Sequence, residues 1–234
     1  MLIISSCLRH HFKGYCSSPE VIMLFVYMKC RFSLSYRELE EMMIMRGAFV
    51  DHSTLQRWVV RFVSLIDERV RQRKKPVKGS WRMDETYIRL NGRWVYLYRA
   101  VDKLGDTIDF LLRAHRDEAA AKAFFKKAFA QNGRPDKVTI DGSASNKAAL
   151  EAENKNLPEE DKIEIRQKKY LNNIAEQDHR FIKKRTRPML GFKSFRSARI
   201  TLSGIENIRM IQKGQIIGQY RNHSAFNNFV NLMA

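Results

Sequence analysis

The chain has 234 residues, of which 44% are hydrophobic, and its 43 lysines and arginines against 25 aspartates and glutamates give a formal net charge of +18. This hydrophobic content is ordinary for a globular protein, and the length suits one large domain with a smaller one. The longest apolar run, Val21 to Met28, falls far short of the ~18 residues that cross a bilayer, so the sequence offers no membrane span.

The positive charge lies at the two ends of the chain. Residues 1–80 hold 14 basic and 7 acidic side chains, residues 81–165 hold 15 of each, and residues 166–234 hold 14 basic and 3 acidic. Basic segments around a neutral middle predict a polyanionic partner, nucleic acid before a membrane surface.

Cysteine usage points to a reducing compartment. The three cysteines, Cys7, Cys16 and Cys30, are an odd number without a tight C-x-x-C spacing. This favours free thiols over disulfides or a zinc site. The apolar opening has no basic residues before it, so we do not interpret it as a signal peptide. The expected location is the cytoplasm.

The first part of the chain has the pattern of two helices joined by a turn. Ser35 followed by Glu38 is a capping box, Gly47 ends that helix, and Asp51 or Ser53 can begin the next. This predicts a helix-turn-helix DNA-binding module, with an ordinary helical hairpin as the alternative. The start of the second helix would contact bases and phosphates through His52, Ser53, Thr54, Gln56 and Arg57.

From residue 81 the pattern changes to strands. Asn91-Gly92 between two alternating segments is a strong hairpin signal, and Trp81, Trp94 and Tyr96 are interpreted as core or sheet aromatics. The elements predict an α/β fold whose mixed sheet opens with an antiparallel meander. The expected strands are 82–90, 93–102, 107–114, 137–141 and 163–167, and the expected helices are 117–132, 143–153 and 170–185.

Two aspartates stand out in this sheet. Asp84 lies inside the first strand and Asp141 ends the fourth. A buried charge needs a partner, which can be an arginine or a metal ion. Glu85 competes with Asp84, because neighbours on a strand face opposite ways and only one should point at a given site.

The last predicted helix carries a single glutamate in a basic surrounding. Glu176, Arg180 and Lys183 fall near one face, because helical positions four and seven residues apart return to the same side. A carboxylate suits magnesium, and the cations suit a phosphate backbone. Taken alone, the segment also fits an exposed basic helix with an incidental acid. Asn172 and Asn173 are expected to cap this helix.

Several segments in one order resemble a known family. WRMDETYIRLNGRWVYLYRAVD, TIDG and NNIAEQDHRFIKKR strongly resemble DDE transposases of bacterial insertion sequences, in the group called IS six. SYRELEEM, DHSTLQRWV and MLGFKSFRSARITLSGIENIRMIQKGQ also match, so the similarity covers about Phe12 to Gly214. Separate motifs in the right order are far more specific than any one of them.

The resemblance implies a ribonuclease-H-like catalytic core that holds two divalent ions, Mg²⁺ or Mn²⁺. By motif match the catalytic and metal-binding acids are Asp84, Asp141 and Glu176, with 34 residues between the last two. The implied reaction is cleavage at the 3′ ends of the element and strand transfer into target DNA. Lys183 and Arg180 would hold the DNA backbone, whereas His179 is expected to be a backbone contact or surface residue. The implied partners are double-stranded DNA and further copies of the chain, as a homodimer or larger assembly.

One departure from the family pattern leaves alternatives open. Gly142 stands where the family usually has lysine, so a DNA-binding regulator with an inactive catalytic domain remains possible, as does a nuclease that cuts without joining. The predicted division is an extension of unknown role (1–11), a helix-turn-helix domain (12–68), a basic linker (69–80), a catalytic domain (81–214) and a C-terminal tail (215–234).

Overall fold

The computed structural model describes residues 2–77, 79–155, 157–168 and 172–234. Its packing divides the chain into a helical unit, Met1–Lys75 with Arg185–Ala234, and a sheet unit, Pro76–Lys184. The predicted catalytic domain extended to residue 214, whereas the segment from residue 185 onward packs with the N-terminal helices. The reason is that α7 (Phe195–Gln212) buries an apolar face against α1 (Pro19–Arg31) and α3 (His52–Arg73). The functional domain boundaries stay predictions.

The helical unit begins as the sequence predicts. Ser35 and Glu38 form the capping box of α2 (Tyr36–Ile44). The Asp51 carboxylate caps α3 by accepting hydrogen bonds from the backbone N–H groups of Ser53 and Thr54. Gly47, in the turn, has φ +75°, a conformation that glycine adopts without strain. With 22 residues, α3 is longer than the short helix predicted and continues into the predicted linker. The unit also contains the short 3-10 helices η1 (Ser6–Phe12) and η4 (Arg187–Met189) and the final helix α8 (Ala225–Met233).

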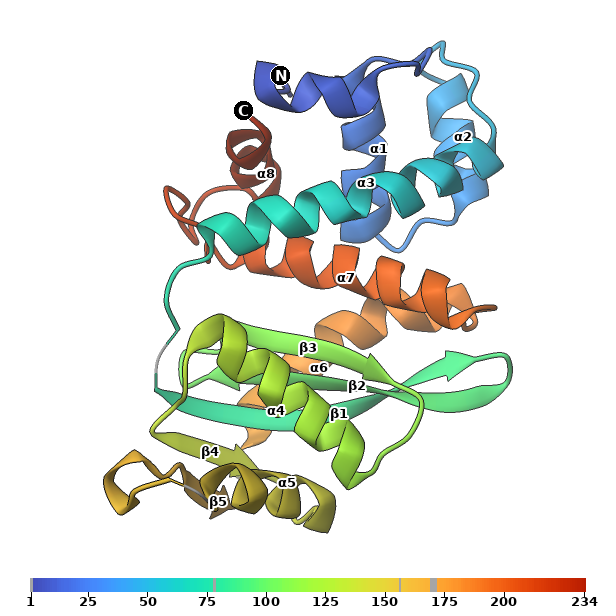
Figure 1. Cartoon of the computed structure of the whole chain (residues 1–234). Helices are drawn as coiled ribbons and strands as arrows, with labels where there is room; N and C mark the ends of the chain where they lie inside the picture. Colours follow the sequence, from blue (N-terminus) through green and yellow to red (C-terminus); the bar gives the residue numbers. More distant parts are fainter. Residues whose placement is uncertain (1, 78, 156, 169–171) are drawn as a thin grey trace. The chain divides into compact units, whose positions relative to one another are not determined.

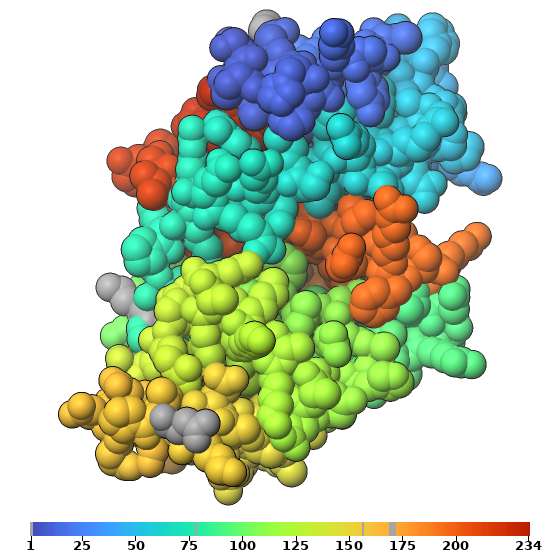
Figure 2. All heavy atoms as spheres, in the orientation of Figure 1, coloured from blue at the N-terminus to red at the C-terminus, as the bar shows by residue number. Residues whose placement is uncertain are grey.

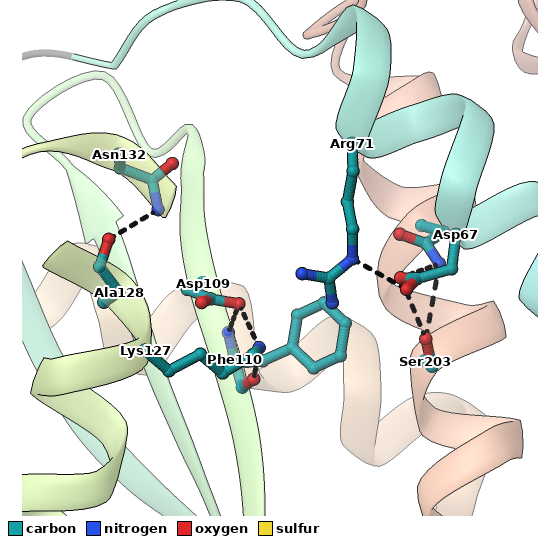
Figure 3. Close-up of polar contacts among 9 residues, drawn as sticks. Asp67, Arg71, Asp109, Phe110, Lys127, Ala128, Asn132 and Ser203 are labelled. Carbon is teal, nitrogen blue, oxygen red and sulfur yellow. Dashed lines mark hydrogen bonds and ion pairs between the residues drawn. The ribbon is translucent and has the colours of Figure 1, made fainter. Parts of the chain in front are cut away.

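A polar contact and a close approach hold α3 and α7 together. Asp67 of α3 accepts hydrogen bonds from Ser203 Oγ (3.2 Å) and Asn207 Nδ2 (2.9 Å) of α7 (Figure 3). A Cβ added at Gly204 would lie 2.5 Å from Cys30 Sγ in α1, so this glycine is what lets the helices meet.

The described residues of the sheet unit form five strands in the order β3-β2-β1-β4-β5. β1 pairs antiparallel with β2, and β2 with β3, whereas β4 runs parallel to β1 and to β5. Asn91 (φ 46°) and Gly92 (φ 76°) make the predicted hairpin turn. The strands are β1 (Ser80–Leu90), β2 (Arg93–Asp102), β3 (Thr107–Arg113), β4 (Lys137–Ile140) and β5 (Glu164–Gln167).

Helices lie on both faces of this sheet (Figure 1). α4 (Glu118–Asn132) and α5 (Ala144–Asn154) cover one face over a core that includes Trp81, Met83 and Phe124. Figure 2 shows the surface of α4 in yellow-green. Lys127 Nζ also ties α4 to β3 through Asp109 Oδ1 at 2.6 Å (Figure 3). The short 3-10 helix η2 (Glu159–Asp161) leads into β5.

α6 (Asn173–Thr186) lies on the other face of the sheet and continues across the division between the units. Residues 170 and 171, which the sequence placed in this helix, lie outside the described residues. The strand order and directions confirm the predicted ribonuclease-H-like mixed sheet with a helix-turn-helix module before it. Within the described ranges no helix is long and apolar enough to cross a membrane.

Candidate active site

The register of two parallel strands brings Asp84 and Asp141 together. Ser80 of β1 pairs with Lys137 of β4, and Arg82 with Thr139. Continuing this register by two residues places Asp84 opposite Asp141, which directly follows the last residue of β4. Backbone pairing therefore places the two acids at one point on the sheet, with Asp84 inside β1 and Asp141 just past the end of β4.

A third carboxylate joins them, and it is Glu85. Ligand atoms of Asp84, Glu85 and Asp141 all lie within 4.8 Å of one another, and we call these residues the acid cluster. The expectation that only one of Asp84 and Glu85 could point at the site is wrong. Because β4 ends at Ile140, the edge of β1 is open beside both residues, and side chains from its two faces can reach the same space.

The partners of Glu85 fix its side chain on the face covered by α4 and α5. Glu85 is opposite Tyr98 in the β1–β2 ladder, and its carboxylate accepts a hydrogen bond from Asn146 Nδ2 of α5 at 3.0 Å. Only 3% of this side chain is exposed. Asp84, one residue earlier, is opposite Arg99 and faces α6 instead. The acid cluster thus wraps around the strand edge.

Arg116 is the cation that bridges the acid cluster. Its Nη2 lies 3.0 Å from Asp141 Oδ2 and 3.3 Å from Glu85 Oε2. No sequence motif indicated this arginine, which lies between β3 and α4. The fold brings Arg116 to the acids from a separate part of the chain, so no nearby sequence pattern predicts this contact.

The electrostatics of the acid cluster fit a divalent cation. Burial, together with the negative charges of Glu85 and Asp141, raises the pKa of Asp84 to about 7. Burial also raises the pKa of Glu85. Oxygen donors that repel one another at close range are the set that a hard cation such as Mg²⁺ or Mn²⁺ binds and neutralises.

Glu176 lies in the first turn of α6, with its side chain exposed. Among the described residues, the carboxylates that meet within 4.8 Å do not include it. Helical structure from residue 173 to 186 does set Glu176, Arg180 and Lys183 along one side of α6, as expected. Arg180 is exposed and Lys183 is half-buried. The role of Glu176 therefore stays a prediction at this point.

Three buried contacts hold the start of α6 on the sheet, and we call them the α6 anchor. Asn172 Nδ2 donates to the carbonyl of Met83 (3.0 Å), and Arg99 Nη2 of β2 pairs with Asp178 Oδ2 (2.7 Å). The third is His179, whose Nδ1 lies 3.6 Å from Asp84 Oδ2. Asn172, expected as a helix cap, instead reaches β1.

His179 corrects a sequence-based expectation. It was expected at the surface or against the backbone, but its side chain is only 2% exposed and lies against Asp84. Burial, with smaller effects from the nearby charges of Arg99 and Lys183, lowers the pKa of His179 to about 2, so the imidazole is neutral. The missed signal was the spacing of Ala175, His179 and Ile182, which share the buried side of the helix.

Gly142 follows Asp141 in open space. The residue is exposed, and a Cβ built on it would meet no atom within 4 Å. The fold therefore does not require glycine here, and a longer side chain would fit.

The predicted DNA-contacting side chains at the start of α3 are accessible. His52, Ser53, Gln56 and Arg57 are exposed, and Thr54 is half-buried. His52 Nδ1 lies 3.0 Å from Glu40 Oε2, and Arg57 Nη2 donates to Thr54 Oγ1 at 2.7 Å. The hydroxyls of Ser53 and Thr54 donate to the Asp51 carboxylate that caps α3. Contact with DNA stays a prediction.

Comparisons with known proteins place the chain in a family. A family model for a DDE domain matches residues 78–215. The transposase for insertion sequence-like element IS431mec of Staphylococcus aureus is 40% identical over 197 residues, which are 84% of this chain and 86% of the relative. The transposase for insertion sequence element IS257 in transposon Tn4003, from the same species, has the same identity and coverage.

Among solved structures, a chain of the simian T-cell lymphotropic virus intasome matches 65% of this chain and 54% of its own length, with 12% identity and a TM-score of 0.44. The family model and the S. aureus relatives agree with the motifs and the strand order of the sheet. The chain therefore belongs to the DDE transposases of bacterial insertion sequences, in the IS six group, which are polynucleotidyl transferases.

Proposed function

We propose that this chain binds the terminal inverted repeats of an insertion sequence, cleaves the 3′ ends and transfers them into target DNA. Family membership supports the reaction class, and the S. aureus transposases align with this chain over most of their length. The observation that carries the proposal is the meeting of Asp84 and Asp141 at the open edge of β1, next to a basic helix.

Asp84, Asp141 and Glu176 are proposed to hold two divalent ions, Mg²⁺ or Mn²⁺. Such ions, when bound, neutralise the charge of the scissile phosphate and stabilise the attacking and leaving oxygens. Glu176 lies three residues, just under one helical turn of about 5.4 Å, before His179, which contacts Asp84. This position, about one helical turn from the residue of α6 that contacts Asp84, supports Glu176 as the third acid.

Cations of the chain are proposed to hold the DNA around the acids. Arg180 and Lys183 follow Glu176 on the same side of α6 and would contact the phosphate backbone. Arg116, already at the acid cluster, would offset the charge of a phosphate there. Positioning and charge neutralisation are the main demands of phosphoryl transfer, because the chemistry needs little acid–base help from side chains.

The helical unit is proposed to recognise the element ends through His52, Ser53, Thr54, Gln56 and Arg57 at the start of α3. Their exposure and the basic charge of this part of the chain support DNA contact. Two ends must be held together for strand transfer, which favours a homodimer or larger assembly. Action on bacterial DNA, together with free thiols, favours the cytoplasm.

The test is strand cleavage and joining on labelled DNA that carries the element's own end, with Mg²⁺, for wild type and Glu176→Gln. We expect nicked and joined products from wild type and their loss in the variant, by about a thousandfold or more because a metal ligand is removed. Glu151→Gln is the matched control, since Glu151 is an exposed acid on α5 away from the acid cluster.

Different products separate the alternatives. DNA binding without any cleavage by wild type would favour the regulator, for which Gly142 is the specific observation. Nicking without joined product would favour a nuclease. Full activity in Glu176→Gln would contradict the role of that residue while leaving the family assignment intact.

A further inference from the structure

The end of the β1–β2 hairpin extends beyond its neighbours in the sheet. β4 pairs with β1 only as far as Arg82, and β3 pairs with β2 only from Tyr96 onward. Residues 88–95 therefore form a two-stranded ribbon, and no strand of the described residues lies beside its outer edges (Figure 1). The green hairpin end also reaches the surface in Figure 2.

One face of this ribbon is aromatic and basic. Tyr87 is opposite Tyr96, and Arg89 is opposite Trp94, so these four side chains share a face, which we call the aromatic ribbon face. The rings of Tyr87 and Trp94 are 6.0 Å apart, those of Tyr87 and Tyr96 are 5.4 Å apart, and the Arg89 guanidinium lies 5.4 Å from the Trp94 ring.

Tyr87 and Trp94 are exposed although the ribbon has a buried side available, whereas Tyr96 is half-buried against the core. Ile88 and Val95 point to the opposite face and are buried. Trp94 and Tyr87 are 54% and 52% exposed. Of the residues expected to be core or sheet aromatics, Trp81 lies in the core, whereas Trp94 lies in the sheet with most of its side chain exposed. A large exposed aromatic cluster on one side of a ribbon indicates a binding surface.

The charge around the cluster suits a polyanion. From Thr86 to Val101 the sequence contains no acidic residue, while Arg89 and Arg93 lie in the ribbon itself. Arg113 of β3 is the partner of Tyr96 across the ladder. Aromatic rings interleaved with arginines are what single-stranded nucleic acid binds, through base stacking and phosphate contacts.

The aromatic ribbon face continues directly from the acid cluster. Glu85 and Tyr87 are two residues apart on one strand face, a distance of about 7 Å. Arg116, which bridges Glu85 and Asp141, also lies near Tyr87. A strand whose phosphate lies at the acids would therefore place its neighbouring nucleotides over Tyr87 and Trp94.

We propose that the aromatic ribbon face stacks unpaired bases of the DNA strand whose phosphate lies at the acid cluster. This rests on the proposed function, because it gives the catalytic unit a way to hold a frayed DNA end. Trp94 would provide the stacking surface, Tyr87 would extend it toward the acids, and Arg89 would contact the phosphates between the bases.

The test compares the affinity of the full chain for two labelled duplexes of one mixed sequence. One has a fully paired end, and the other has a few unpaired bases, including 2-aminopurine, at that end. Wild type should bind the frayed duplex more tightly, and Trp94→Ala should reduce this preference about tenfold, the usual effect of losing one stacking ring. Trp94→Phe should keep most of the preference and the quenching of 2-aminopurine fluorescence.

Leu104→Ala is the matched control, since Leu104 is 57% exposed in the turn after β2, and it should leave the preference unchanged. Binding is measured without metal, so the result does not depend on cleavage, which is assayed separately to test the proposed function. Equal weakening of both duplexes by Trp94→Ala, or no change in either, would overturn the proposal. So would a shift in sedimentation of Trp94→Ala with an unchanged preference, which would indicate a self-association surface.

Discussion

Asp84 and Asp141 are positioned by backbone pairing, whereas Glu176 is positioned by side chains. The first two follow from the register of β1 and β4. Glu176 depends on a helix that the α6 anchor holds on the sheet through Asn172, Asp178 and His179. A backbone ladder tolerates changes in side chains, but a few buried polar contacts do not. The two halves of the proposed site should therefore respond differently to mutation.

The largest effect is expected from Asp84→Asn, which leaves the ladder intact. Cleavage should fall by about a thousandfold or more, because a proposed metal ligand is lost. Without metal, the melting temperature should stay the same or rise at neutral pH. The reason is that burial, together with the charges of Glu85 and Asp141, raises the pKa of Asp84 to about 7, so its charged form destabilises the fold.

Parallel activity assays and thermal melts in chelator check this prediction. Asp161→Asn is a suitable control, because that acid is exposed in η2, and neither its activity nor its stability should change. A large loss of stability in Asp84→Asn would show that Asp84 is a structural residue, and the comparison would then fail.

Asp178→Asn should affect the other half of the site by destabilising the fold. The Arg99–Asp178 pair is 1% and 5% exposed, and removing one partner of such a pair costs about 3–5 kcal/mol. The free energy of unfolding from denaturant titration measures this. Glu151→Gln, which breaks an exposed pair with Lys147, should cost about 0–1 kcal/mol.

A double variant separates stability from positioning. Arg99→Met with Asp178→Leu replaces the buried pair with apolar side chains and should recover most of the stability. If the anchor positions Glu176, turnover stays below wild type although the protein is folded. Full recovery of turnover would mean that the pair acts only through stability.

Local signals made much of the fold predictable from the sequence. The Ser35–Glu38 capping box, the Asn91-Gly92 hairpin and the strand that ends just before Asp141 each depend on residues close together in the chain. Asp84 and Asp141 each stood out as an acid in a strand, and the family resemblance put them in one site. Glu176 also stood out as the single acid of a basic predicted helix, but only the family resemblance gave it a place in the same site.

Features that depend on long-range packing were not predictable. Arg116 reaches Glu85 from a loop 31 positions along, and Arg99 meets Asp178 from 79 positions away. Glu85 joined the acid cluster because β4 ends early, which alternation along a single strand cannot show. Likewise, the packing of α7 with α1 and α3 joins surfaces far apart in sequence.

The smallest effect is expected from Gly142→Lys at the open edge. Stability should change by less than about 0.5 kcal/mol, because a side chain there meets nothing within 4 Å. A lysine beside Asp141 would add one phosphate contact, so the salt dependence of DNA binding, plotted as log affinity against log salt, should steepen by about 1. Binding titrations at several salt concentrations measure this slope.

Gly142→Gln is the matched control, since it adds length without charge and should leave the slope as in wild type. If the wild-type site lacks one cation, cleavage should rise in Gly142→Lys. The rise should be modest, because Arg116 already supplies most of the charge that a phosphate needs. Activity that appears only in Gly142→Lys would mean that Arg116 does not suffice, and that the wild-type chain binds DNA without cutting it. An unchanged slope would place the DNA backbone away from residue 142, on the side of the acid cluster that faces α6.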